Sequence, residues 1–284
     1  MRLDGRRLDV ALPCGLRGVD EGPHRRATLV PLDGGAELLA ADEPNPFLAA
    51  HLVLARCLRR LGARVDVAVD DVRSLMVADR DFLVIQLDRL TFGDVRYQTM
   101  RCPLPECGSR MDVEIDLAGV TPPEPPRSRE LTFALGDGHP LRFRMMVAGD
   151  QEALADVAAE ARSTALLDRC ILGTPEEVRR TRERIEPRER TALALAIGEA
   201  TPLLDLALGL ACPKCKAPFV HVYDPLRGLF GRIQRSRDEL LTEVHHLAIH
   251  YHWSHREILE LPRTLRREYL EILERELSPR KGLG

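Results

Sequence analysis

The chain has 284 residues, 44% of them hydrophobic, and a formal net charge of −3 at pH 7. This length and apolar content allow one large or two medium domains with a real hydrophobic core. The near-neutral charge, the lack of a large basic block and an aromatic content of 4% argue against a nucleic-acid-binding surface, which relies on phosphate contacts and stacking.

Composition also bears on the compartment. No apolar run approaches the ~20 residues that a membrane span needs, and the first residues lack the apolar stretch of a signal peptide. The seven cysteines are an odd number, and four of them occur in two close pairs. That usage suits a reducing compartment better than a disulfide framework. We therefore expect a cytoplasmic protein.

The first half of the chain predicts short strands followed by helices. Strand-like pieces lie between glycines and charged residues, over residues 8–12 and 27–32. Helical periodicity then covers three segments, residues 47–61, 70–76 and 79–90. A turn at residues 91–94 leads into a strand over residues 95–100.

The second half opens with a proline-rich stretch over residues 122–126, which is typical of an extended linker. A β-hairpin is predicted next, from residues 131–135 and 141–146. Asp150 is suited to capping a helix that follows, and helical segments are expected over residues 151–172, 175–200, 237–253 and 262–277. Ser254 and Glu257 form a capping box that starts a short helix between the last two.

These elements divide the chain into five segments. We expect an N-terminal strand-like, irregular segment over residues 1–45, and then a helical region with the first cysteine knuckle over residues 46–120. A proline-rich linker follows over residues 121–130. Residues 131–235 hold the hairpin, helices and the second knuckle, and residues 236–284 form a C-terminal helical cassette.

Two cysteine knuckles carry the strongest chemical signal. They are Cys102-Pro-Leu-Pro-Glu-Cys107 and Cys212-Pro-Lys-Cys215, and an alternating, strand-like stretch follows each one. Tetrahedral zinc takes four soft ligands, and a cysteine turn of this kind presents two thiolates to one point. We therefore expect Cys102, Cys107, Cys212 and Cys215 to hold one structural zinc ion in a zinc ribbon. The fold class predicted is α+β: mostly helical, with this small zinc-ribbon-like β element and the C-terminal helical cassette.

Two other interpretations of the cysteines stay open, free core cysteines and a redox dithiol. A redox C-x-x-C normally opens a helix after a strand, whereas a strand pattern follows Cys215. Cys14, Cys57 and Cys170 are isolated. The last two lie in apolar helical runs and are interpreted as small core side chains.

Five histidines gather between residues 245 and 255. His246 and His250 have the spacing of a helical metal site, but the residues between them lack the glutamate that a zinc-protease helix uses as general base. A zinc hydrolase is therefore a minor alternative. The plainer interpretation places His246, His250 and His255 on a solvent face, with His245 and His252 packed or hydrogen-bonded between helices.

The C-terminal pattern resembles a known family. The residues are Glu243-Val-His245 and Tyr251-His-Trp-Ser254, followed by Leu261-Pro262 and Arg266-Arg-x-Tyr269. With the segment over residues 75–94, the two knuckles, and Asp224-Pro225 before Phe230, this pattern is similar to the T-even-type phage baseplate hub assembly proteins, or baseplate hub assembly chaperones. Relatives of that family occur in contractile injection system clusters. The resemblance covers roughly residues 70–275 and leaves the first 45 residues outside it.

The resemblance implies a non-enzymatic assembly factor, chaperone or minor structural component of the baseplate hub of a phage tail or phage-like contractile injection system. Its partners would be baseplate, hub or spike proteins, with no membrane, nucleic acid or small-molecule substrate. We expect the contact surface on the C-terminal cassette, at Glu243, His245, Tyr251, His252, Trp253, Arg266 and Arg267. The main alternative is a zinc-ribbon nucleic-acid-binding regulator.

Overall fold

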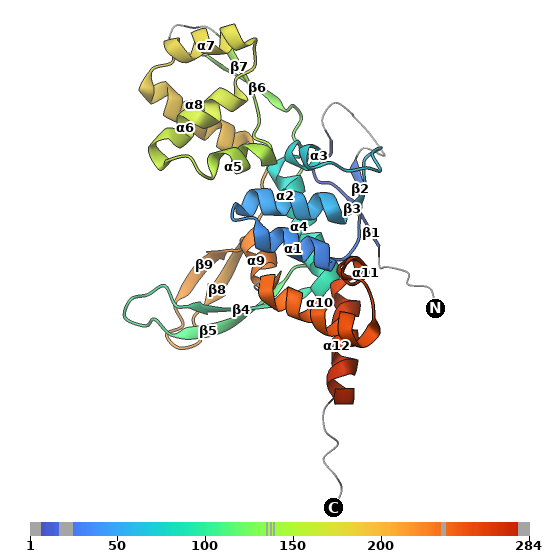
Figure 1. The fold of residues 1–284 in the computed structure, drawn as a ribbon. Helices are drawn as coiled ribbons and strands as arrows, with labels where there is room; N and C mark the ends of the chain where they lie inside the picture. The colour runs from blue at the N-terminus through green and yellow to red at the C-terminus, as the bar shows by residue number, and fades with distance from the viewer. Residues whose placement is uncertain are drawn as a thin grey trace, which may run out of the picture.

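The computed structural model describes residues 7–16, 25–134, 136, 138, 140–233 and 237–277. It is an α+β structure in which helices pack with several small antiparallel sheets, and two hairpins project from its side (Figure 1). A central body carries a helical lobe at one end, a pair of β-hairpins at its side and the C-terminal helices at the other end.

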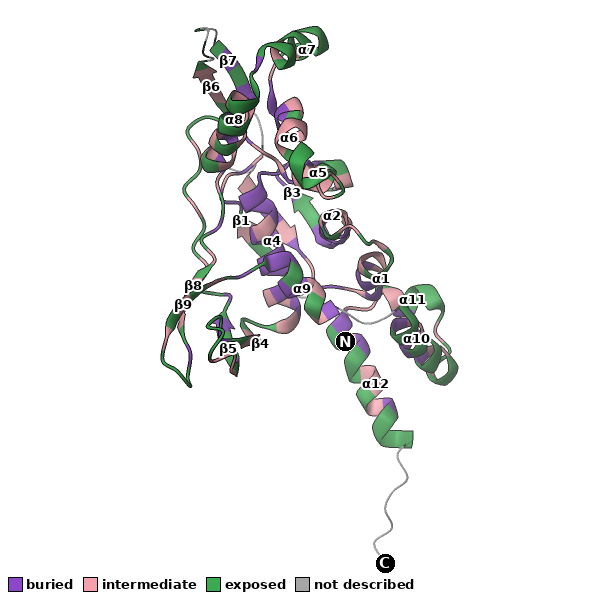
Figure 2. Ribbon diagram, turned by 90° about the vertical axis from the view of Figure 1, so that its left-hand side faces the viewer, coloured by how far each residue is buried: buried purple, intermediate pink, exposed green. Residues whose placement is uncertain are grey.

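The central body is built on a three-stranded antiparallel sheet with strand order β1-β2-β3. Its strands are β1 (Leu8–Ala11), β2 (Arg26–Leu29) and β3 (Leu58–Leu61). Five helices share its hydrophobic core: α1 (Gly34–Asp42), α2 (Pro46–Cys57), α3 (Val69–Arg73), α4 (Val77–Phe92) and α9 (Pro225–Ile233). Helix α4 is buried along most of its length in the middle of the molecule (Figure 2). The segment predicted as N-terminal and irregular therefore contributes to the main core.

Three of these elements differ from the sequence-based expectation. Helix α1 lies in the segment predicted to be irregular. Its two glycines lower the helix propensity of this segment, so the sequence does not predict the helix. Gly34 is needed there, since an added Cβ would lie 2.8 Å from the Arg266 guanidinium. Residues 58–61, predicted as the end of a helix, form β3 because they pair with β2. Helix α9 was also missed.

Two hairpins lie beside the central body. They are β4 (Val95–Arg101) with β5 (Arg110–Asp116), and β8 (Ala207–Ala211) with β9 (Pro218–Val222). The hairpins are separate two-stranded sheets and do not join into one ribbon by strand pairing. A hydrophobic cluster seats both of them on α4, where Phe82 and Ile85 contact a group that includes Ile115, Leu204 and Tyr223.

The helical lobe has its own core, centred on Leu141, Phe143, Leu193 and Ile197. Its elements are β6 (Glu130–Ala134), β7 (Pro140–Arg144), α5 (Ala148–Leu154), α6 (Arg162–Cys170), α7 (Pro175–Arg184) and α8 (Pro187–Ala200). The two long helices expected over residues 151–172 and 175–200 are each broken in two. The second break falls where Ile185 turns into the core and the chain restarts at Pro187.

The C-terminal cassette consists of α10 (Arg237–Tyr251), α11 (His255–Glu260) and α12 (Arg263–Leu277). The predicted capping box is confirmed, because Ser254 accepts the Glu257 N–H and Glu257 accepts the Ser254 N–H. A buried ionic network fastens the cassette to α1. Arg266, which is fully buried, donates to Glu37 at 2.8 Å and to Glu243 at 3.1 Å.

A second buried charge holds the helical lobe together. Asp150 is fully buried and accepts hydrogen bonds from Arg144, Arg169 and the Val147 N–H. Burial alone would raise the pKa of Asp150, but these donors outweigh it and hold the pKa below its ordinary value of 3.8. The carboxylate therefore caps α5 from its first turn and ties β7 to α6.

We expect Asp150→Asn to lower the free energy of unfolding at pH 7 by about 3 kcal/mol, because it leaves two arginines without their anion. A depressed folded-state pKa means that the contribution is full above pH 3.8 and is lost as the pH falls through the lower folded value. The free energies of unfolding of the wild type and the variant should therefore converge only below pH 3.8. As a control, Glu130→Gln removes an exposed pair with Arg142 and should cost less than about 1 kcal/mol. An equal cost for both variants at pH 7 would contradict this role of Asp150.

Candidate metal centre

The two cysteine knuckles meet at the tips of the two hairpins. The Sγ atoms of Cys102, Cys107, Cys212 and Cys215 all lie within 4.8 Å of one another. Two sulfur pairs make contact across the knuckles, with Cys102 and Cys215 at 3.7 Å and Cys107 and Cys212 at 3.8 Å. These separations are far longer than the ~2.05 Å of a disulfide bond, and all four thiols are free.

The sulfur arrangement fits a tetrahedral ion. An ion about 2.3 Å from each of four sulfurs would hold those sulfurs about 3.8 Å apart. The crossed contacts of 3.7 and 3.8 Å match that edge, and all four sulfurs lie within 4.8 Å of one another. The four cysteines can therefore hold a metal ion, as predicted, with each hairpin supplying two ligands.

Both knuckles reach this geometry through the same backbone turn. The residue directly after the second cysteine has a left-handed conformation in each case, with φ of 50° at Gly108 and 62° at Lys216. In the first knuckle the Gly108 N–H bonds to the Leu104 carbonyl, and in the second the Lys216 N–H bonds to the Cys212 carbonyl. The turn has the same length in both knuckles, so the two extra residues of the first knuckle precede it, and both pairs of thiols still reach the same centre.

The environment of the sulfurs favours ionisation at one of them. Backbone N–H groups of Cys215 and Lys214 point at the sulfur of Cys212 and lower its pKa from 9.0 to about 6. The Leu104 N–H acts to lower the pKa of Cys102 as well, but burial and the three neighbouring sulfurs raise it to about 12. Four thiols this close oppose each other's ionisation, and a cation among them removes that opposition.

Apolar side chains cover part of the centre. Cys102 and Cys212 are buried and form a small cluster with Met111, while Phe219 and Met100 pack against it. Cys215 is exposed. The centre therefore lies at the solvent-facing tip of the hairpins, with its inner half shielded from water.

The remaining cysteines stay outside the centre. Cys57 and Cys170 are buried, as their interpretation as core side chains predicted, and burial raises the pKa of each well above 9.0. Cys14 is half-buried, and its backbone N–H donates to Asp79. The redox interpretation is not supported by the second knuckle, because strand β9 and not a helix follows it.

Five of the seven residues predicted to form the contact surface are either buried or exposed. Glu243 and Arg266 are buried and bonded to each other, so they belong to the scaffold and cannot serve as an exposed surface. His245, His252 and Arg267 are exposed. The structure therefore leaves only part of this predicted surface open to a partner.

Tyr251 and Trp253, also predicted to contact a partner, belong to an aromatic cluster. Their rings stack at 4.9 Å, and Tyr269 meets Trp253 edge-on at 4.8 Å. This cluster closes the cassette between α10 and α12. Trp253 is half-buried in it, which favours a packing role for this residue.

The histidines do not form a metal site. His246 and His250 are exposed on α10, as the plainer interpretation predicted, but His245 and His252 are exposed as well and are not packed between helices. Within the described ranges, no group of three or more potential ligands that includes a histidine converges on one point.

Comparison with known proteins identifies no relative: no family model, curated protein or solved structure matches this chain. In the part of the chain that the structure describes, no helix has the length and apolar character needed to cross a membrane. The function must therefore be argued from the chain itself.

We expect Cys212→Ser to remove one equivalent of bound metal and to lower the melting temperature of the whole chain. The binding energy of a structural metal site is on the order of 10 kcal/mol and is coupled to folding. Metal content by mass spectrometry and thermal unfolding test this, with Cys14→Ser as a control that removes a thiol outside the centre. An unchanged metal content and melting temperature in Cys212→Ser would contradict the site.

The knuckle turn gives a second prediction. Gly108→Ala should cost about 1 kcal/mol and weaken metal retention, because an L-residue is strained at φ of 50° although the added Cβ meets no atom. The same substitution at Gly198, in helix α8 and also with open space around the Cβ, should stabilise the chain by about 0.5–1 kcal/mol. Unfolding in denaturant measures both, and two effects of the same sign would contradict this account of the turn.

Proposed function

We propose that the protein is a non-enzymatic assembly factor, chaperone or minor structural component of the baseplate hub of a phage tail or phage-like contractile injection system. In this proposal a structural zinc ion held by the four cysteines fixes a protein-binding surface. Two features support the proposal: the type of metal site and the surface of the hairpin beside it.

Zinc is the ion that this donor set favours. Four thiolates at tetrahedral spacing are typical of structural zinc sites, whereas a catalytic zinc keeps one position open for water or substrate. Cys102, Cys107, Cys212 and Cys215 would fill all four positions. Such an ion supplies folding energy and holds the hairpins together.

The observation that carries the proposal is the outer face of the second hairpin. Its outward residues are uncharged and all exposed: Ala207, Gly209 and Ala211 on β8, opposite Pro218, Val220 and Val222 on β9. Val220 is 69% exposed and Val222 is 68% exposed. An antiparallel sheet with one solvated face normally carries polar residues there. A contiguous apolar face left in solvent is typical of a protein-binding surface.

The first hairpin, β4–β5, has no such apolar outer face. Its outward residues are mostly polar and bond across the strands, as Tyr97 does with Glu114 and Thr99 with Asp112. The apolar character is therefore particular to β8–β9 and is not a general property of the hairpins.

The metal explains how such a face can be kept flat and exposed. An isolated two-stranded hairpin is marginally stable in water. Here its tip is tied to β4–β5 through the four sulfurs, and its base is seated on α4 through Leu204 and Tyr223. The apolar face is thus displayed on a hairpin that is fixed at both ends.

The assignment to a baseplate hub rests on the resemblance of the C-terminal pattern. Several residues of that pattern have structural roles, since Glu243 and Arg266 lock the cassette to α1 and Ser254 caps α11. The pattern therefore describes the scaffold, and the apolar face of β8–β9 is the surface we assign to partner binding. This face argues against the nucleic-acid-binding alternative, because it carries no charge to contact phosphates.

The proposal predicts that tagged protein captures hub or spike proteins from its native host, as identified by mass spectrometry. We expect the double variant Val220→Asp/Val222→Asp to lose that capture while it keeps its metal. Val65→Asp is the matched control, since Val65 is an apolar side chain of similar exposure, 62%, on another face. Capture of tail proteins that survives the double variant, or a salt-dependent shift of labelled DNA or RNA, would contradict the proposal.

A further inference from the structure

A groove borders the apolar face at its base. It has a volume of about 620 Å³, which lies in the range of specific ligand pockets. Its walls come from the start of α2, the chain before β8, and the junction between β9 and α9, and they include Phe47, Leu204, Pro225 and Phe230. Leu203, which is 53% exposed, and Val222 belong to the groove as well, so the apolar face continues into it.

A buried guanidinium lines this groove. Arg80 is 1% exposed; its Nε donates to Asp81 at 2.6 Å, its Nη2 donates to Gln151, and Phe47 lies against the group at 5.5 Å. Its Nη1 has no hydrogen-bond partner. A buried donor without an acceptor costs free energy, more so in a charged group. The Nη1 of Arg80 therefore lacks a hydrogen-bond acceptor, and an oxygen atom of a ligand could serve as one.

A smaller cavity at the β9–α9 junction is also lined by an arginine. It holds about 400 Å³ and shares Val222, Asp224, Arg227 and Phe230 with the groove. Arg96 lines it; its Nε has no hydrogen-bond partner, and its Nη1 faces the Asp88 carboxylate at 3.8 Å. The charged residues that line the two cavities, apart from His221, are Arg80, Arg96 and Arg227 against Asp81 and Asp224. This balance and the unpartnered Nη1 of Arg80 favour an anionic group.

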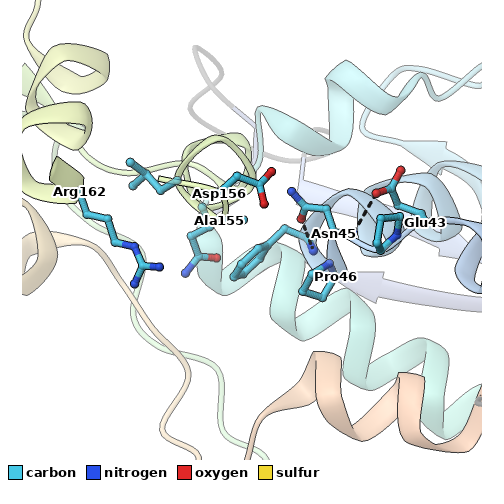
Figure 3. A pocket seen from close by; sticks show the side chains of 10 residues that line it. Glu43, Asn45, Pro46, Ala155, Asp156 and Arg162 are labelled. Atoms are coloured by element: carbon cyan, nitrogen blue, oxygen red, sulfur yellow. Dashed lines mark hydrogen bonds between the residues drawn. The ribbon is translucent and has the colours of Figure 1, made fainter. Parts of the chain in front are cut away.

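A third cavity, of about 520 Å³, extends the groove along the start of α2 and shares Pro46, Phe47 and Gln151 with it. Figure 3 shows Arg162 on one side of this cavity and Glu43, Asn45 and Pro46 on the other. The side-chain oxygen of Asn45 is used to cap α2, where it accepts the Phe47 N–H. This end therefore makes the groove longer. The unpartnered donor is the Nη1 of Arg80, which lies outside this end.

We infer that the groove and the adjoining apolar face bind an extended segment of a partner protein that carries apolar side chains and a carboxylate. The apolar side chains would cover Leu203 and Val222, and the carboxylate would accept from Arg80. Apolar walls disfavour a nucleic-acid backbone, which needs a basic track. This inference deepens the proposed function by naming the chemistry of the partner segment, and it rests on that function for the partner being a protein.

The test uses two fluorescein-labelled, amidated hexapeptides and the full-length, metal-loaded chain. One peptide has the sequence Leu-Phe-Leu-Glu-Leu-Phe, and its twin has Gln in place of Glu. We expect the Glu peptide to bind about tenfold more tightly by fluorescence anisotropy, because a hydrogen bond to a charged partner is the stronger kind. Equal binding of the twins, or no binding at millimolar peptide, would overturn the inference.

Variants locate the site. Leu203→Asp should weaken the Glu peptide about tenfold or more, because it adds a carboxylate to the apolar surface. Ile249→Asp is the matched control, since Ile249 is also 53% exposed but lies on α10, and it should leave binding unchanged. Arg80→Gln should make the twins bind equally, with metal content and thermal unfolding checked first. Because Leu203 is exposed, its variant keeps the test decisive if Arg80→Gln does not fold.

The other outcomes separate this inference from the proposed function. Unchanged peptide binding in Leu203→Asp, or displacement of the Glu peptide by a single-stranded oligonucleotide, would overturn the inference. If hub proteins are captured in the host but neither peptide binds, the inference fails and the proposed function stands. If the Glu peptide binds as expected but no tail protein is captured, the inference about the groove stands and the hub assignment fails.

Discussion

The convergence of four cysteine sulfurs on one point is the constraint on which the rest of the structure depends. It joins the tips of two hairpins that are far apart in the sequence, with sulfur contacts of 3.7 and 3.8 Å. Strand pairing does not connect these hairpins to each other. Their seat on α4 and the small cluster around Met111 also hold them together. A metal ion bound by the four sulfurs would add a fixed link at the tips, beside the apolar face of β8–β9.

Buried charges fix the other parts of the molecule in a similar way. Arg266 joins α12 to α1 and α10, Asp150 joins β7 to α6, and Asp88 on α4 lies between Arg232 of α9 and Arg96 of β4. Each of these groups is satisfied mainly by opposite charges from other elements. Breaking such a pair leaves an uncompensated charge, so these contacts specify one arrangement of the elements. Arg80 lines the groove, and its buried Nη1 has no hydrogen-bond partner.

The sequence predicted features whose causes are local. The knuckles, the strands that follow them and the capping box at Ser254 are specified by residues a few positions apart, and the structure confirms all three. The α+β class followed from the same patterns. Asp224 is another local feature, since its side chain accepts the Arg227 N–H at the start of α9.

What the sequence did not predict depends on contacts between distant segments. Helix α9 was missed because Gly228 and Gly231 reduce its helical signal, yet Gly228 is required where an added Cβ would collide with Tyr223. The burial of Glu243 could not be foreseen, because its partner Arg266 and their common anchor Glu37 come from separate parts of the chain. The sequence does carry a signal for the apolar face of β8–β9, since residues on both faces of these strands are mostly apolar. The aromatic residues near Trp253 form a more conspicuous pattern, and the predicted contact surface was based on them.

The most direct test of the central claim is X-ray absorption spectroscopy at the zinc edge on the purified, full-length protein. The account predicts a single shell of four sulfur atoms at about 2.3 Å from the metal. A shell that contains nitrogen or oxygen ligands, or protein that retains no metal after purification without chelators, would contradict it.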